Sequence, residues 1–159
     1  MPRAKYRIAE VAIEGFRGFT ERQVVPIDEK NVFIFGQNGH GKSSIVEAIR
    51  WCLFGSTSGA DIEVRNTFYD KGCRVSLVLK GSSGSLRVER ELRPGSERSR
   101  QCLYDSAGKE VAARHALPGL NRLGAHDSAQ VIFAGQHAGG RQLNADITDF
   151  GRVLAFISG

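Results

Sequence analysis

The sequence has 159 residues, 41% of them hydrophobic and 25% charged, which is the composition of a globular protein with one core. Its net charge of +5 and pI of about 9.4 are compatible with binding to nucleic acid. No apolar run approaches the ~20 residues that cross a bilayer, and the N-terminus leads into a strand-like segment and not a signal peptide, so a cytoplasmic protein without membrane contact is expected.

The first 35 residues predict three strands. In Lys5–Glu14, alternate residues form two sets that would point to opposite faces of a strand, and this pattern predicts a strand with one well-buried face. Gly15–Phe19 is expected to turn the chain, and Gln23–Ile27 is expected to form a second strand. Val32–Phe35 is a short apolar run that predicts a third strand.

The most specific motif directly follows that run. Gly36–Ser43 fits G-x-x-x-x-G-K-[ST], the phosphate-binding loop of nucleotide triphosphatases. In such a loop the glycines admit backbone N–H groups to the phosphates, Lys42 reaches the β- and γ-phosphates, and the Ser43 hydroxyl ligates Mg²⁺. The predicted nucleotide-binding residues here are Gly36, Asn38, Gly39, His40, Gly41, Lys42, Ser43 and Ser44.

A helix is predicted over Ser44–Phe54, with Gly55 as its C-terminal stop. Its spacing of apolar residues places one face toward a core, through Ile45, Ile49 and Leu53. The order strand, loop and helix is the one that the phosphate-binding motif requires. The three cysteines form no C-x-x-C pair, so neither a disulfide framework nor a zinc site is indicated, and Cys52 is expected to pack in the core.

The rest of the chain predicts a meander followed by mixed elements. Asp61–Tyr69 is expected to be short helical or irregular structure. Turn residues separate three predicted strands that suggest an antiparallel meander: Arg74–Lys80, Ser85–Leu92 and Arg100–Tyr104. Beyond them we expect a short helix at Val111–Leu117, a buried strand at Gln130–Ala134, and partly helical structure over Leu143–Ile157.

The densest basic stretch lies within the meander and has two interpretations. It contains glutamates interleaved with five arginines: Arg87, Arg90, Arg93, Arg98 and Arg100. The first interpretation is a solvated face of a β-hairpin. The second is a surface that contacts the phosphate backbone of DNA.

The motifs together resemble the N-terminal lobe of an SMC-like ABC ATPase head, of the SbcC and RecF DNA-repair type among AAA-type P-loop NTPases. The resemblance rests on Gly15–Phe19, on the loop and helix start at Gly36–Ser44, and on the helix end at Leu53-Phe54-Gly55. It implies an α/β fold, a P-loop NTPase lobe of the ABC type with an added antiparallel β-meander. Residues 1–159 would then form that lobe, with ATP and Mg²⁺ as cofactors.

The resemblance also assigns roles to three residues outside the loop. Arg17 matches the arginine that approaches the phosphates of the bound nucleotide. Gln136 follows a predicted apolar strand, as does the family's Q-loop glutamine, which contacts Mg²⁺ and the attacking water. The resemblance therefore predicts Gln136 and Lys42 as catalytic residues. It also predicts Gln136 and Ser43 as metal ligands. Lys71 resembles a family lysine near the nucleotide.

The sequence contains neither a Walker B strand ending in Asp-Glu nor a complete Leu-Ser-Gly-Gly signature. In the family both lie in a C-terminal lobe beyond a coiled coil, so a fragment of a longer protein is expected, one that binds nucleotide weakly and hydrolyses it negligibly. The resemblance implies a nucleoid-associated protein whose partners are a second ATPase head, double-stranded DNA and a nuclease subunit. The alternatives are a complete small P-loop kinase and a non-enzymatic module that binds DNA or dimerises heads.

Overall fold

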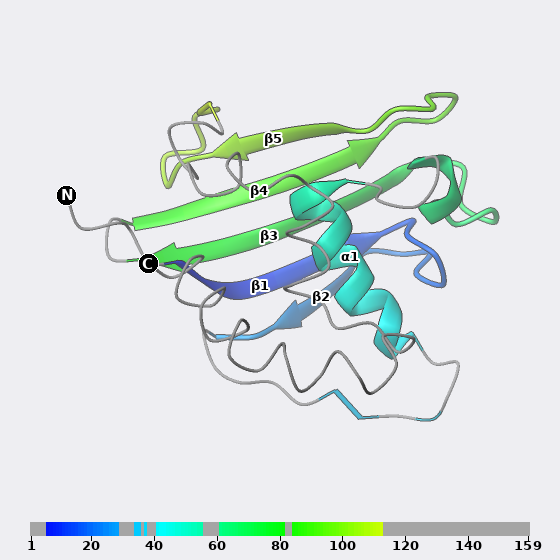
Figure 1. The fold of residues 1–159 in the computed structure, drawn as a ribbon, viewed down its shortest axis with the longest axis horizontal. Helices are drawn as coiled ribbons and strands as arrows, with labels where there is room; N and C mark the ends of the chain where they lie inside the picture. The colour runs from blue at the N-terminus through cyan, green and yellow to red at the C-terminus, as the bar shows by residue number, and fades with distance from the viewer. Residues whose placement is uncertain are drawn as a thin grey trace, which may run out of the picture.

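The structure is a computed structural model that describes residues 6–28, 34–35, 37, 41–55, 61–81 and 84–112. Within these residues, one helix crosses one face of a five-stranded sheet (Figure 1). The strand order is β2-β1-β3-β4-β5, and every neighbouring pair is antiparallel. The elements are β1 (Tyr6–Glu14), β2 (Gln23–Pro26), α1 (Lys42–Phe54), the 3-10 helix η1 (Asp61–Val64), β3 (Cys73–Gly81), β4 (Gly84–Leu92) and β5 (Arg100–Tyr104).

The predicted antiparallel meander is confirmed by β3, β4 and β5. Alternate residues of β3 are buried beneath α1, while Arg74 and Lys80 between them are exposed. This period of two is what a half-buried strand requires. The buried face is continuous across the sheet through Val75, Leu77, Val88, Leu92 and Leu103.

The predicted strand at Lys5–Glu14 is confirmed as β1, which lies between β2 and β3. Its pairing with β3 shifts register between Ile8 and Glu10. The carbonyl of Ala9, within this irregularity, accepts hydrogen bonds from the backbone N–H groups of Ile27 and Asp28 at 2.8 and 2.9 Å. A shift of this kind bends a strand and re-aims its side chains, so the end of β2 is held against β1 at this point.

The helix α1 is fixed to the sheet along its buried face and at its C-terminus. Ala48, Trp51 and Cys52 are buried, as predicted for Cys52. The carbonyl oxygen of Cys52 accepts hydrogen bonds from Arg90 Nε at 3.2 Å and from Gln101 Nε2 at 2.7 Å. Side chains of β4 and β5 thereby satisfy a helix end that would otherwise leave carbonyls without partners. The arginine charge also complements the negative end of the helix dipole.

The boundaries of α1 differ slightly from the prediction. The helix begins at Lys42, two positions before the predicted Ser44, because Gly41 has φ 83° and ends the loop in a left-handed conformation. At the other end Gly55 has φ 78° and donates its N–H to the carbonyl of Trp51 at 2.8 Å. Gly55 is therefore the C-terminal stop that the sequence predicted.

Two predicted elements, at 32–35 and 111–117, are described only in part, and their described residues differ from the prediction. Ile34 and Phe35 do not lie in a strand, and Phe35 is 87% exposed. An apolar run becomes a strand only beside a partner strand, and no described strand pairs with these residues. No helix starts at Val111 either, because its N–H bonds the carbonyl of Leu103 at 2.8 Å and extends the pairing along β5. The expected elements at 130–134 and 143–157 lie outside the described residues.

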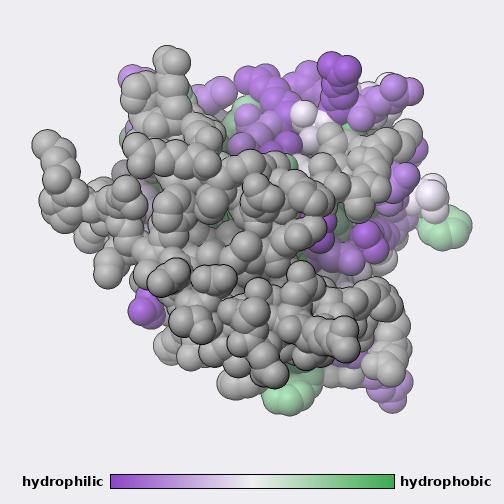
Figure 2. All heavy atoms as spheres, in the orientation of Figure 1, coloured by the Kyte–Doolittle hydropathy of each residue, from purple (hydrophilic) through white to green (hydrophobic). Residues whose placement is uncertain are grey.

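The basic stretch is divided between the core and the surface. Arg90 faces α1, with its guanidinium 5.8 Å from the centre of the Trp51 ring, so it belongs to the packing of the helix. Arg87 is exposed and lies 4.7 Å above the ring of Tyr104. In the space-filling view of Figure 2, the described surface over β4, β5 and their connection is mostly hydrophilic. No helix in the described part of the chain is long and apolar enough to span a membrane.

We expect Gly15→Ala to lower the free energy of unfolding by more than about 1 kcal/mol. Gly15 has φ 63°, where a Cβ costs roughly 1–2 kcal/mol, and the added Cβ would overlap the carbonyl oxygen of Gly72. Gly18→Ala is the matched control, since nothing lies within 4 Å of the added atom. Urea unfolding of both variants tests the prediction, and equal stabilities would contradict it.

A second prediction concerns pH. Burial raises the pKa of the Cys52 thiol to about 12, above the ~8.5 of an unfolded cysteine. The stability that this protonated thiol contributes is present below about pH 8.5 and is lost as pH rises toward 12. Between pH 8.5 and 10.5, the free energy of unfolding should therefore fall more steeply for the wild type than for Cys52→Ala. Equal slopes for the two proteins in this range would contradict the prediction.

Candidate nucleotide-binding site

The N-terminus of α1 is open to an anion. No side chain caps it, and its first turn contains no acidic residue. The first N–H groups of a helix have no partner within the helix and carry a partial positive charge. Lys42 and Ser43 are the first two residues of α1, and Ser43 is exposed. Backbone donors, an ammonium group and a hydroxyl are thus placed together, which is the donor set that a phosphate requires.

The Lys42 side chain folds back over the loop that precedes the helix. Its Nζ donates a hydrogen bond to the carbonyl oxygen of Gln37 at 2.7 Å. Gly41 lies against Phe19, whose ring carbon Cζ would be 3.4 Å from a Cβ at this glycine. The turn after β1 therefore contacts the start of α1, and the two motifs that carried the resemblance meet in space.

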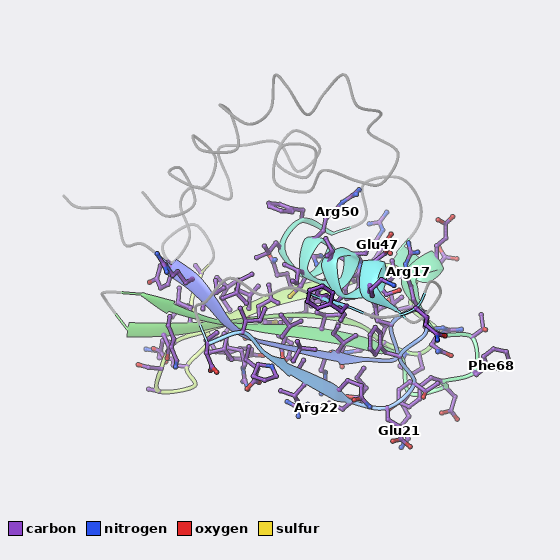
Figure 3. All side chains as sticks on the ribbon, turned by 90° about the horizontal axis from the view of Figure 1, so that it is seen from below. Arg17, Glu21, Arg22, Glu47, Arg50 and Phe68 are labelled. Atoms are coloured by element: carbon purple, nitrogen blue, oxygen red, sulfur yellow. The ribbon has the colours of Figure 1, made fainter. Side chains whose placement is uncertain are left out.

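Arg17 is held at this end of α1 by its backbone and its side chain. Its φ is 46°, and its N–H donates to the carbonyl of Val64 at 2.7 Å. Its own carbonyl accepts a hydrogen bond from Asn66 Nδ2 at 2.5 Å. The guanidinium Nε lies 2.9 Å from Glu47 Oε2, and Figure 3 shows the two side chains pointing toward one another from the turn and from α1.

Neighbouring residues anchor the turn in the core. Phe16 is fully buried, and its ring centre lies 5.6 Å from that of Trp51 at an angle of 48°. Such tilted aromatic pairs are favourable beyond the area that they bury. Because Trp51 belongs to α1, the residue before Arg17 packs directly on the helix that carries Lys42.

Asn66 is a residue that sequence reasoning missed. It is 6% exposed, and its backbone N–H bonds the carbonyl of Gly15 at 2.8 Å. Its Oδ1 accepts the N–H of Phe68 at 2.8 Å while its Nδ2 holds the Arg17 carbonyl. The only local signal is an asparagine near a turn, a residue type that favours such bonds to nearby backbone.

Comparison with known proteins agrees with this geometry. The sequence model of the AAA domain family matches residues 10–124, which is more than half of the chain. The chain belongs to this family. The chromosome partition protein Smc of Bordetella petrii is 38% identical over 108 residues, covering 68% of this chain and 8% of that protein. The Smc protein of Methylococcus capsulatus is 29% identical over 147 residues, covering 90% of this chain and 11% of that protein.

Two solved structures share the fold of this AAA domain. One is described as structural biochemistry of ATP-driven dimerization and DNA-stimulated activation of SMC ATPases. Its TM-score is 0.61 at 17% identity, with 90% of this chain and 98% of that chain covered. The other is the SMC head domain from Thermotoga maritima. Its TM-score is 0.50 at 24% identity, with 69% of this chain and 40% of that chain covered. The resemblance to an SMC-like ABC ATPase head and the α/β P-loop fold class are confirmed.

The described residues fit the phosphates of a nucleotide. The uncapped start of α1 has no acidic side chain that would repel them. Gly41 has φ 83°, a backbone conformation that residues with a side chain rarely adopt, and it lies in van der Waals contact with Phe19. Of the other predicted binding residues, Ser44 lies in the first turn of α1. Four predicted loop residues and the predicted Q-loop residue lie outside the described residues: Gly36, Asn38, Gly39, His40 and Gln136.

Lys71 occupies a different part of the AAA domain from Lys42. It lines a pocket of about 200 Å³ together with Glu14, Tyr69, Arg74 and Glu91. Arg74 pairs with Glu91 across β3 and β4, and the next pair along these strands is Val75 with Arg90. Neighbouring pairs point to opposite faces of a sheet. Because Arg90 faces α1, Arg74 and Glu91 lie on the face away from α1. The role of Lys71 near a nucleotide remains a prediction.

Hydrogen bonds shift two pKa values in that pocket. The Tyr69 hydroxyl donates to Glu14 Oε1, which raises the pKa of Tyr69. Arg74 Nη2 donates to Glu91 Oε1 at 2.7 Å, which lowers the pKa of Glu91. Both carboxylates of the pocket are therefore already engaged by neighbouring side chains.

We expect Asn66→Ala to lower the free energy of unfolding by about 1–3 kcal/mol, because it leaves the Arg17 carbonyl and the Phe68 N–H without their partner. Phe68→Ala is the matched control on the same loop. Phe68 is 93% exposed, and changes at such positions stay within roughly 0.5 kcal/mol. Chemical denaturation measures both, and a neutral Asn66→Ala would contradict the role given to this side chain.

Proposed function

We propose that this chain is the ATP-binding half of an SMC-like ATPase head, in which Mg-ATP clamps two heads together to control engagement of DNA or a nuclease. The observation that supports it most is the uncapped N-terminus of α1, which carries Lys42 and Ser43 and is followed at Glu47 by the ion pair with Arg17. The chain covers 8% and 11% of the two Smc relatives above, so the activity of a whole protein is part of this proposal.

The proposed roles follow the chemistry of each group. Lys42 would hold the β- and γ-phosphates, Ser43 would ligate Mg²⁺, and Arg17 would add a second positive charge at the phosphates. Bound Mg²⁺ supplies charge neutralisation to phosphoryl transfer. Gln136 is proposed as a further Mg²⁺ and water contact. Because the sequence contains no Walker B Asp-Glu pair, we expect these 159 residues alone to hydrolyse ATP negligibly.

The proposed partners are a second head, double-stranded DNA and a nuclease subunit. One related structure concerns ATP-driven dimerization and DNA-stimulated activation of SMC ATPases, which supports the first two. The curated relatives are chromosome partition proteins, which supports a cytoplasmic, nucleoid-associated location. Exposed arginines on β4 and in its connection to β5 offer a surface for DNA phosphates: Arg87, Arg93 and Arg98. A steep fall of DNA affinity with salt would support such contacts.

The alternative of a complete small P-loop kinase is less well supported. Such kinases are built from βαβ units around a parallel sheet, whereas every described strand pair is antiparallel. The second alternative is a non-enzymatic module that binds DNA or dimerises heads. It differs from the main proposal because its function would need no ATP hydrolysis. Steady-state hydrolysis by the 159 residues separates the complete P-loop enzyme from the other two, since robust turnover that depends on Lys42 would favour it.

We expect Lys42→Ala to weaken binding of Mg-ATP by roughly 10- to 200-fold, because a charge-assisted contact to phosphate is worth about 1.5–3 kcal/mol. Titration of the chain with a fluorescent ATP analogue measures this. Lys109→Ala is the matched control, at an exposed lysine in the turn after β5. Unchanged affinity in the Lys42 variant would contradict the assignment of the phosphate-binding loop.

A further inference from the structure

We propose that Glu47 is the positioning residue for Arg17, holding its guanidinium by Nε so that its two terminal amino groups face the phosphate site. This inference rests on the proposed function. The inference goes beyond the proposed function because it assigns a role to a helix residue, Glu47, that would not itself contact the nucleotide. Figure 3 shows Glu47 and Arg17 beside one another, with Arg50 of the same helix farther along it.

The contact geometry leaves the guanidinium free for an anion. Glu47 Oε2 lies 2.9 Å from Nε, and no other ion pair of Arg17 occurs within the described residues. A guanidinium carries five N–H donors in a planar fork, and only one of them is on Nε. The four donors on the terminal nitrogens therefore remain for bidentate contact with a phosphate.

The carboxylate is also shielded where it meets the arginine. Glu47 Oε2 is buried and has no hydrogen bond of good geometry in the described part of the chain, although it lies close to Nε. Charge attraction between two fixed elements, and not an ideal hydrogen bond, therefore holds the pair. Its position on α1 links it to Lys42 through a rigid helix, so one element would set the directions of both cationic side chains.

Electrostatics explain why a carboxylate is needed here. The N-terminus of α1 carries a partial positive charge, and Lys42 adds a full charge beside it. Both repel Arg17 when no anion is present. The backbone of Arg17 is already fixed by Val64 and Asn66, but the backbone does not decide where a long side chain points. The negative charge of Glu47 offsets the repulsion and keeps the guanidinium at this end of the helix.

The pair contributes little to folding stability. Its side chains are 48% and 39% exposed, and exposed pairs are worth at most about 1 kcal/mol. Effects of its loss on nucleotide affinity can therefore be separated from unfolding. Thermal denaturation of each variant checks that the fold is kept.

A double-mutant cycle on Mg-ATP affinity tests the proposal, using Glu47→Ala, Arg17→Ala and the double variant of this chain. We expect Glu47→Ala to weaken binding about threefold to tenfold and to have no further effect once Arg17 is alanine. Glu47→Gln keeps the size of the side chain but removes its charge, so it should weaken binding about as much as Glu47→Ala. Glu21→Ala is the matched control, because Glu21 is exposed and forms no ion pair with a described residue.

A second readout needs no nucleotide. The NMR signal of the Arg17 Nε–H group should move in Glu47→Gln and stay unchanged in Glu21→Ala. Additive effects in the cycle, or tighter ATP binding by Glu47→Ala, would overturn the proposal, the latter because Glu47 would then compete with phosphate for Arg17. If Lys42→Ala weakens binding while Arg17→Ala does not, the positioning role fails and the proposed function stands. If neither variant weakens binding, the proposed function itself fails.

Discussion

The packing of Trp51 and its neighbours on α1 against the sheet is the interaction on which the candidate site depends. Trp51 contacts Phe16 from the turn after β1 and lies under Arg90 from β4. A helix of this length is marginal on its own in water, so its position comes from this buried face. Because the turn and the helix share one aromatic contact, Arg17 and Lys42 are placed relative to each other by the core.

Some contacts of the site join residues that are close in sequence, and others join residues that are far apart in sequence. The loop and the start of α1 are contiguous in sequence, whereas Asn66 reaches Arg17 and Gln101 reaches Cys52 across nearly fifty positions. Arg17 thus receives its backbone position from one segment and its side-chain direction from another. Such division is common where a functional side chain must be held in a sparsely populated backbone conformation.

Much of the fold could be predicted from local pattern. The period of two in β3 and β4 reports their buried face. The spacing of Ile45, Ile49 and Leu53 on α1 identifies residues that pack on the core but are only partly buried, beside the buried face of Ala48, Trp51 and Cys52. The motif likewise identified Lys42 and Ser43. Local pattern could not reveal Asn66 or Glu47, because their partners are distant in sequence and both residue types are common on surfaces. It misassigned Ile34 and Phe35 because hydrophobicity does not disclose whether a partner strand exists.

The hydrogen bonds from Arg90 and Gln101 to the last turn of α1 have a mechanical consequence. They tie the far end of the helix to two strands, while Phe16 and Glu47 tie it to the turn after β1. The helix therefore has no free direction in which to slide over the sheet. A force applied at its first residues would be passed along the helix to β4 and β5, whose side chains hold its last turn.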